Sequence, residues 1–323
     1  MTTGAPMGPW PELPLEPWRG TRDTLHLVSQ LLGKTLLATC QPQNHWWHTA
    51  LRVTARGLAS PAPAGERGLD LELDLVDHAI VVRTPGRDRR LPLVGGRSMH
   101  AYLDGYRALL RDVGLDVELW PVPVEVVAPV PFDRDDVPRP YDRAQAHQFF
   151  DVLRRCDAAL KGLAGRFLGK QSPVHFFWGS FDLAATRFSG RRAPQRSGAD
   201  PVTREAYSHE VISFGFWPGG VNQVGVAVDA PVLYAYAAPE PDGFRDAHVP
   251  DPGRYDTRLG EFVLPYDEIA PRPDPAAEIR AFCEAVYAAG AALGGWDRAI
   301  LERDAAPAAT PAHAHADVHP ITH

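Results

Sequence analysis

Apolar residues recur at steps of four and three along residues 144–168, and an alternating strand pattern follows directly at 174–188. The first pattern consists of Phe149, Leu153, Cys156, Leu160, Leu163 and Phe167. A period of 3.6 residues puts such side chains on one face of a helix, whereas alternation puts strand side chains on two opposite faces. The apolar face of this helix therefore has to pack against a β-sheet. This predicts an α+β fold in which helices cover antiparallel sheets.

The same two patterns recur elsewhere in the chain. Helices are expected at 24–37, 98–113 and 275–293; Ser98 and Asp274 are the caps of the last two. Strands are expected wherever short apolar runs alternate with polar residues. These runs are residues 45–56, 69–75, 80–82, 117–127, 208–216, 231–237 and 260–266.

The expected elements run helix, strands, helix on both sides of a Pro-rich stretch. The segments that start at His45 and His175 share the histidine, two following aromatic residues and most of the apolar phase. We interpret this as internal duplication, although two unrelated aromatic strands would give the same appearance. The expected units are a Pro-rich segment at 1–20, a first half at 21–130, a Pro-rich bridge at 131–140, a second half at 141–303 and a disordered His-rich tail at 304–323.

Composition excludes several classes of partner. A net charge of −7 argues against nucleic acid, because phosphate binding needs a basic surface. No apolar run is long enough to span a membrane, and the start of the chain lacks the pattern of a signal peptide. Three separated cysteines form no CxxC and fit a reducing cytoplasm. A small molecule is therefore the expected partner, in the cytoplasm, and the oligomeric state stays open.

Strand phase selects three candidate site residues. His45 alternates in phase with Leu51 and Val53, and His175 with Leu183, so both imidazoles are expected to point inward. Glu210 is in phase with the apolar residues of its strand, and a buried carboxylate needs a partner. His45, His175 and Glu210 are the ingredients of a divalent transition-metal site, and equally of a metal-free acid/base site. The structural alternative is that each histidine donates to a backbone carbonyl and Glu210 pairs with an arginine.

Further candidates for ligand binding surround this set in the sequence. The loop 187–196 is basic in an acidic protein, and arginines in such a loop suit carboxylate or phosphate groups, although a solvated loop gives the same pattern. Trp217, Tyr234 and Tyr236 are aromatic residues that could line a pocket or fill the core. The candidates for ligand contact are Trp47, Trp178, Asp182, Arg187, Arg191 and His209. A bulge in this strand would make His209, in place of Glu210, the inward residue.

Four segments identify a family resemblance. They are HWWHTALRVTARGL at 45–58, GKQSPVHFFWGSFDLAATRFSGR at 169–191, REAYSHEVISFGFWPGG at 204–220 and LGEFVLPYD at 259–267. The chain resembles a family of uncharacterised bacterial proteins, classed as a domain of unknown function, over roughly residues 8–303. The resemblance implies a single unit of about 300 residues in the bacterial cytoplasm. It supplies no catalytic residues.

These observations lead to one expected function and an alternative. The first is an enzyme that acts on a small polar or anionic molecule through the inward His45, His175 and Glu210, with or without a metal. The alternative is a non-enzymatic small-molecule-binding or sensor protein with an aromatic pocket. A scaffold that uses exposed aromatic patches is a third reading. The first hypothesis predicts that His45, His175 and Glu210 face one cavity between the two halves.

Overall fold

The computed structural model describes residues 9–60, 68–222 and 224–303. Four longer helices form where apolar stripes and caps coincide: α1 (Leu15–Thr39), α2 (Met99–Asp112), α3 (Arg143–Lys161) and α6 (Pro275–Leu293). Ser98 Oγ accepts a hydrogen bond from Ala101 N, and the Asp274 carboxylate accepts one from Ala277 N, as expected of N-caps. The shorter helices are α4 (Pro201–Ala206), α5 (Tyr266–Ile269) and α7 (Arg298–Leu301), with 3₁₀ turns η1 (Asn44–Trp46), η2 (Phe132–Arg134), η3 (Ala164–Arg166) and η4 (Phe244–Asp246).

A five-stranded antiparallel meander forms the first sheet. Each strand pairs with the next along the chain, in the order β1-β2-β3-β4-β5. Helix α1 contacts β3, and α2 contacts β4 and β5, so both pack on this sheet. Its strands are β1 (Arg52–Val53), β2 (Gly57–Ala59), β3 (Asp70–Asp74), β4 (Ala79–Thr84) and β5 (Arg87–Pro92).

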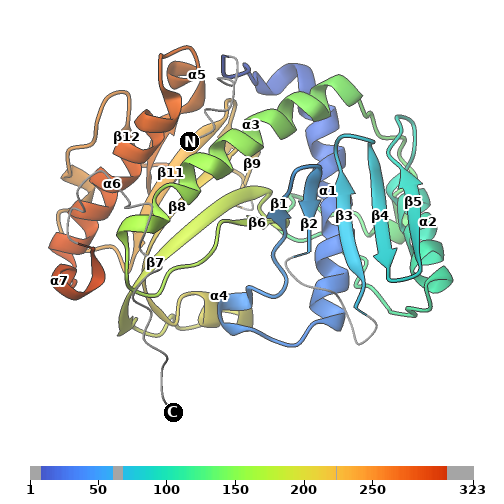
Figure 1. The fold of residues 1–323 in the computed structure, drawn as a ribbon, viewed down its shortest axis with the longest axis horizontal. Coiled ribbons are helices and arrows are strands. Elements are labelled where there is room, and N and C mark those ends of the chain that lie inside the picture. Colours follow the sequence, from blue (N-terminus) through green and yellow to red (C-terminus); the bar gives the residue numbers. More distant parts are fainter. Residues whose placement is uncertain (1–8, 61–67, 223, 304–323) are drawn as a thin grey trace, which may run out of the picture.

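The second sheet is six-stranded and antiparallel, in the order β12-β13-β11-β8-β7-β6. Helices α3 and α6 cover one of its faces, as Figure 1 shows. A separate two-stranded ribbon pairs β9 (Gly220–Val221) with β10 (Ala227–Val228). The six strands are β6 (His175–Phe177), β7 (Asp182–Arg192), β8 (His209–Trp217), β11 (Val232–Ala238), β12 (Arg254–Asp256) and β13 (Glu261–Pro265).

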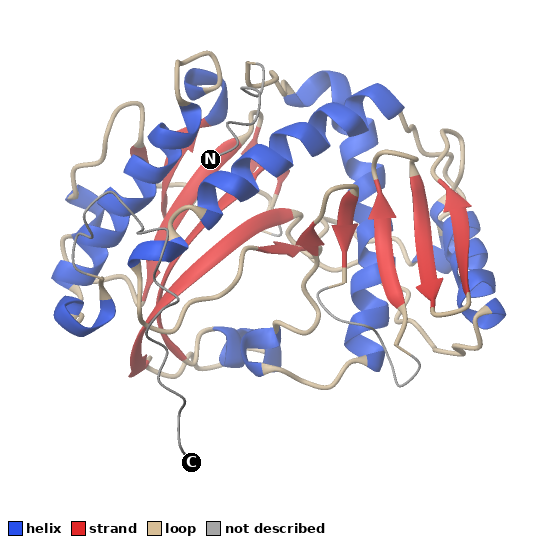
Figure 2. Ribbon diagram, viewed as in Figure 1, coloured by secondary structure: helices blue, strands red, loops and turns tan. Residues whose placement is uncertain are grey.

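Two hydrogen bonds join the two sheets edge to edge. Leu51 N donates to Phe176 O over 2.9 Å, and Phe176 N donates to Leu51 O over 2.7 Å. The sheets consequently stand side by side in Figure 2, with β1 next to β6. Both residues are fully buried, and they belong to a continuous apolar core that runs through the two sheets and their helices.

The α+β class and the four long helices are confirmed, but three strand predictions are wrong in detail. Residues 44–46 form a 3₁₀ turn in which His45 and Trp46 have positive φ, so only Arg52–Val53 of the predicted strand 45–56 is strand. Residues 117–127 contain no strand; they lie in an irregular connection between α2 and α3, residues 113–142, called the connecting segment below. Residues 174–188 are not one strand, because a turn that includes Phe181 at φ 61° divides them into β6 and β7.

The duplication is not shown by this architecture. The sheets differ in strand number and order, and His45 lies in a turn whereas His175 opens a strand. Helix α1 begins at Leu15, so the end of the predicted N-terminal segment 1–20 is helical. The predicted tail at 304–323 lies outside the described residues. Within the described ranges, no helix is long and apolar enough to cross a membrane.

Candidate functional site

His45 lies in the η1 turn, on the sheet face opposite α3 and α6. Its Nδ1 donates to Glu205 O over 3.1 Å, and its Nε2 accepts from Lys170 Nζ over 2.7 Å. The ring centroid lies 4.6 Å from that of Phe188 and 5.7 Å from that of His209. Burial, with a smaller effect of the Lys170 charge, lowers the pKa of His45. Both ring nitrogens are thus engaged, and the imidazole is held neutral.

His175 is fully buried, beside the rings of Trp47 and Phe177. Its ring centroid lies 5.8 Å from that of Trp47, and neither ring nitrogen has a hydrogen-bond partner among the described residues. Burial first, and then the charge of Arg52, lowers its pKa to about 4. His175 pairs with Ala184 across the hairpin, so it faces away from Leu183, against the predicted phase. It is nevertheless inward, because Trp47 covers it.

Glu210 is separated from the two histidines, and the prediction of a common cavity is wrong for this residue. Its carboxylate accepts from Ser189 Oγ over 2.8 Å and pairs with the Arg191 guanidinium over 2.7 Å. Arg191 also donates to Gly295 O at the end of α6, which places Glu210 on the helix-covered face. His209, the preceding residue, faces His45 instead. The register of β7 against β8 shifts between Phe188 and Arg192, and this irregularity holds the Ser189 and Arg191 partners.

Two other predicted ligand contacts have structural partners. Trp178 Nε1 donates to Thr49 O over 2.8 Å, and its ring packs where a side chain on Gly33 of α1 would stand. The Arg187 guanidinium is buried, pairs with Glu284 over 3.0 Å and donates to Leu163 O over 2.7 Å. No group of three or more His, Cys, Asp or Glu residues in the described part of the chain is arranged to hold a metal ion. The predicted metal set is therefore not brought together.

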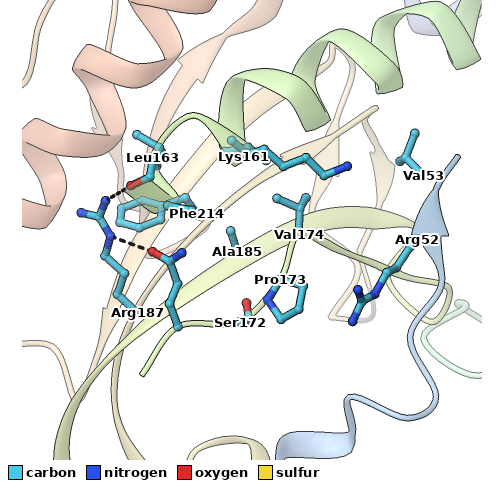
Figure 3. A pocket seen from close by; sticks show the side chains of 13 residues that line it. Arg52, Val53, Lys161, Leu163, Ser172, Pro173, Val174, Ala185, Arg187 and Phe214 are labelled. Carbon is cyan, nitrogen blue, oxygen red and sulfur yellow. Dashed lines mark hydrogen bonds between the residues drawn. The ribbon is translucent and has the colours of Figure 1, made fainter. Parts of the chain in front are cut away.

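Arg187 also lines a cavity of about 230 Å³ beneath the end of α3. Figure 3 shows Arg52 and Arg187 at opposite ends of this cavity, with Ser172 and Val174 between them. The Arg187 end is closed by the bonds to Leu163 and to Gln171 Oε1. The Lys161 ammonium, which also lines the cavity, is paired with Asp157 over 2.6 Å. Lys161, Gln171 and Arg187 are therefore engaged by the protein itself, whereas Arg52 Nε is buried without a hydrogen-bond partner among the described residues.

A second cavity, of about 290 Å³, has a different lining. We call it the acidic cleft. It lies between α1, the connecting segment and the open face of the six-stranded sheet, and it shares Arg22, His26, Glu125 and Val221 with an adjoining cavity of about 300 Å³. Three carboxyl groups from three distant segments meet there. The cleft is lined by Arg22, His26, Glu125, Ser180, Asp182, Tyr207, Trp217, Val221, Asn222, Val224, Val232, Tyr234, Tyr236, Leu259 and Glu261.

Helix α1 positions the connecting segment along the cleft. The Gln30 side chain bonds both backbone groups of Val124: Nε2 donates to the carbonyl and Oε1 accepts from N–H, each over 2.9 Å. Lys34 Nζ donates to Val122 O over 2.8 Å. Glu125 follows with a φ of 55°, a conformation that non-glycine residues rarely adopt and that clusters at functional sites. Its carboxylate consequently rests against Gly179, where a Cβ would come within 2.5 Å of Oε1.

Asp182 forms the buried floor of the cleft. Its carboxylate accepts hydrogen bonds from Ser180 Oγ and from the Tyr234 hydroxyl. Burial raises the pKa of Asp182, while these two bonds oppose the rise. Burial and the neighbouring Asp182 charge raise the pKa of Tyr234 well above its usual range, so Tyr234 remains a donor.

The charge of Asp182 acts on the carboxyl groups of both glutamates in the cleft. Withdrawal from water, with a smaller contribution from the Asp182 charge, raises the pKa of Glu125 and of Glu261 to about 7. Glu125 as a whole residue is exposed, although its carboxylate lies against Gly179, whereas Glu261 is half-buried at the start of β13. Glu261 is therefore the better placed of the two to exchange a proton near neutral pH away from bulk water.

His26 closes the α1 side of the cleft as a neutral donor. Its Nε2–H donates to Gly179 O over 2.7 Å, and burial lowers its pKa to about 3. The Arg22 guanidinium pairs with Asp23 over 2.8 Å and lies 5.7 Å from the centre of the Phe181 ring. The positive charge of this wall is thus largely offset within α1.

The sequence identified Asp182, Trp217, Tyr234 and Tyr236 of this lining, but it missed the residues that complete it. Glu261 lies in a strand that was predicted, on the same face as the buried Val263 and opposite Phe262 and Leu264, and a carboxylate at such a position was a usable signal. Glu125 had none, because it lies in irregular backbone between prolines. The ionisable lining residues that sequence reasoning did not single out are Arg22, His26, Glu125, Tyr207 and Glu261.

Fold and cleft together define an α+β protein with two sheets joined at their edges and an acidic, aromatic-walled cleft. The chain belongs to a family of unknown function, DUF5996, whose model matches residues 10–303. No curated protein matches the chain. No solved structure matches it either.

Proposed function

We propose that this protein is an enzyme that binds a small polar molecule in the acidic cleft and transfers a proton through Glu261. The observation that carries this proposal is the convergence of Glu125, Asp182 and Glu261 from three segments on one cavity. Paired carboxyl groups with displaced pKa values are the usual means of acid/base work at neutral pH. The proposed substrate is a small molecule, as expected from the sequence. The proposed reaction takes place in the acidic cleft and does not involve His45, His175 or Glu210.

Each carboxyl group has a distinct role in this proposal. Asp182, held by Ser180 and Tyr234, is a fixed acceptor that orients the bound molecule and raises the pKa of both glutamates. Glu261, with a pKa of about 7, is protonated in about half of the molecules at neutral pH and so serves as acid or base. Glu125 at the mouth contacts the solvent-facing end of the molecule. A small-molecule partner in the cytoplasm, without nucleic acid, membrane or metal, is part of the proposal.

Equilibrium dialysis against a pooled extract of small metabolites tests the proposal. Molecules retained by the full-length protein are identified by mass spectrometry, and their chemical change is followed over time. We expect Asp182→Asn to abolish retention. Glu261→Gln should weaken retention by no more than about tenfold and slow conversion of the bound molecule by about a hundredfold, within the usual range for loss of a general acid or base. Glu268→Gln, an exposed carboxylate on α5 outside the cleft, is the matched control.

The alternative function, a non-enzymatic binding or sensor protein, uses the same cleft. The aromatic lining from Tyr207, Trp217, Tyr234 and Tyr236 favours it, since these side chains supply binding surface and no proton-transfer group at neutral pH. Retention without conversion would select this alternative. Retention that is unaffected by Asp182→Asn would contradict both functions.

A further inference from the structure

The acidic cleft combines carboxyl groups with aromatic rings in a way that selects the charge of its ligand. We propose that it binds a small organic cation through an ammonium group. This inference rests on the proposed function and names the ligand class of the same cleft. Three features support it: the charge of the cleft, the hydrogen bonds that already engage its tyrosine hydroxyl groups, and an unsatisfied indole donor.

The charge of the lining favours a cation. Three carboxyl groups, from Glu125, Asp182 and Glu261, line the cavity. Of the two basic side chains there, His26 is neutral, and Arg22 is paired with Asp23 over 2.8 Å. A ligand ammonium would restore the ionised form of the glutamates, since an opposite charge nearby favours the charged carboxylate. A ligand carboxylate or phosphate would instead face uncompensated like charge.

The tyrosine hydroxyls are already used within the wall. Tyr234 donates to Asp182, and the hydroxyls of Tyr207 and Tyr236 lie 3.0 Å apart in a hydrogen bond. The Tyr234 and Tyr236 rings stand parallel, 13° apart in plane and 6.3 Å between centroids. The Arg196 guanidinium already lies 3.9 Å from the centre of the Tyr207 ring. What Tyr234 and Tyr236 offer a ligand is therefore aromatic surface, which attracts ammonium groups.

Trp217 supplies an independent observation, an unsatisfied donor in the lining of the cleft. The residue lines the cavity and is 9% exposed, and its Nε1 is buried without a hydrogen-bond partner in the described part of the chain. A buried donor without an acceptor is costly, and such groups in native structures call for an explanation. A hydroxyl or carbonyl oxygen on the cation would satisfy it. The preferred ligand is thus an amine that also carries an oxygen acceptor.

Cation binding should release protons, because Glu261 and Glu125 are partly protonated at neutral pH. The affinity should rise between about pH 6 and about pH 8 as these groups ionise, by about tenfold for one group with a pKa of about 7. Below about pH 7 the observed binding enthalpy should depend on the ionisation enthalpy of the buffer. A cation that bound only to aromatic surface would show neither effect.

Isothermal titration of the full-length protein with choline tests the inference. Choline carries a quaternary ammonium and a hydroxyl, and 3,3-dimethylbutan-1-ol is its uncharged isostere of the same shape. We expect saturable choline binding with a Kd below about 1 mM at pH 8 and binding of the isostere at least about tenfold weaker. Glu261→Gln and Tyr236→Leu should each weaken choline by about tenfold, whereas Glu268→Gln should leave it unchanged.

The outcomes separate this inference from the proposed function. Equal affinity for choline and its isostere would overturn the cation inference, because charge would then contribute nothing. Retention of only neutral or anionic metabolites in the dialysis experiment, with loss in Asp182→Asn, would also overturn it and leave the proposed function standing. No retention of any molecule and no choline binding would remove both.

Discussion

The side-chain amide of Gln30 holds the backbone of Val124 by both of its hydrogen-bonding groups, over 2.9 Å in each case. Val124 precedes Glu125, so a residue in the middle of α1 fixes where a carboxyl group enters the acidic cleft. The two residues are separated by 94 positions in the chain. The cleft therefore depends on the docking of the connecting segment to α1, in addition to the six-stranded sheet.

Replacement of Gln30 by Ala should free the connecting segment. The Val124 N–H and C=O would lose their protein partners, at a cost of about 1–3 kcal/mol in the free energy of unfolding. Hydrogen exchange of the Val124 amide should become faster by a larger factor than that of amides in β8. Gln148→Ala, which removes a surface hydrogen bond to Glu12 O, should leave Val124 exchange unchanged. Equal protection of Val124 in both variants would contradict the docking role.

Replacement of Glu261 by Gln should reduce the pH dependence of stability between about pH 4.5 and pH 7. Folding raises the pKa of Glu261 from 4.5 to about 7, so the folded state binds more protons than the unfolded state in this window. The free energy of unfolding therefore falls as the pH rises through the window. The effect should be on the order of 1 kcal/mol, because solvent screens a half-buried group. Urea denaturation at about pH 5 and pH 8 measures it, with Glu268→Gln as the control.

Replacement of His175 by Leu should protect the protein against acid. The pKa of His175 falls from 6.5 to about 4 on folding, so only the unfolded state binds this proton between those values. The contribution of neutral His175 to the free energy of unfolding is fully present above about pH 6.5 and is lost as the pH falls toward 4. The effect of the substitution on the free energy of unfolding should be about 2 kcal/mol more favourable at about pH 5 than at about pH 8. His248→Leu, at an exposed position, should show no such gain in urea denaturation.

Replacement of Lys170 by Met should raise the pKa of His45. The Lys170 ammonium lies 2.7 Å from His45 Nε2 and its charge opposes protonation of the ring, second only to burial. Titration of the ring C–H signals by NMR measures the change. Arg192→Met is the matched control, because Arg192 lowers the pKa of His209 and is not among the causes for His45. An unchanged His45 in Lys170→Met would show that burial alone sets its pKa.

Local patterns predicted the helices well, and non-local geometry explains what they missed. Ser98 and Asp274 marked the starts of α2 and α6 correctly, because a cap and an apolar stripe are both written in consecutive residues. The prediction that His175 faces the same side as Leu183 was wrong, because a turn at Phe181 divides the apparent strand into a hairpin. Strand alternation cannot be carried across such a turn.

The site was harder to predict than the fold for the same reason. Glu210 was expected in one cavity with His45 and His175, but it lies on the helix-covered face, and its partner Arg191 lies in an irregular part of β7 that no spacing indicates. Glu125 reaches the cleft through a positive φ and a clamp from Gln30, and both depend on contacts between distant segments. Asp182 was named from its place near His175, and its neighbours in the cleft come from α1, β8, β9, β11, β13 and the segments between elements.

The hydrogen-bonded junction between Leu51 and Phe176 also determines which strand edges are open to other copies of the chain. The two larger sheets would otherwise present four edges, and unpaired edges recruit strands from other chains. At the junction, β1 and β6 each cover the edge of the other. The remaining edges are β5, which carries Arg87, Asp88, Arg89 and Arg90, and β12, which carries Arg254 and Asp256. Charged edge strands resist intermolecular pairing, so opening the junction would expose the least protected edges of the molecule to aggregation.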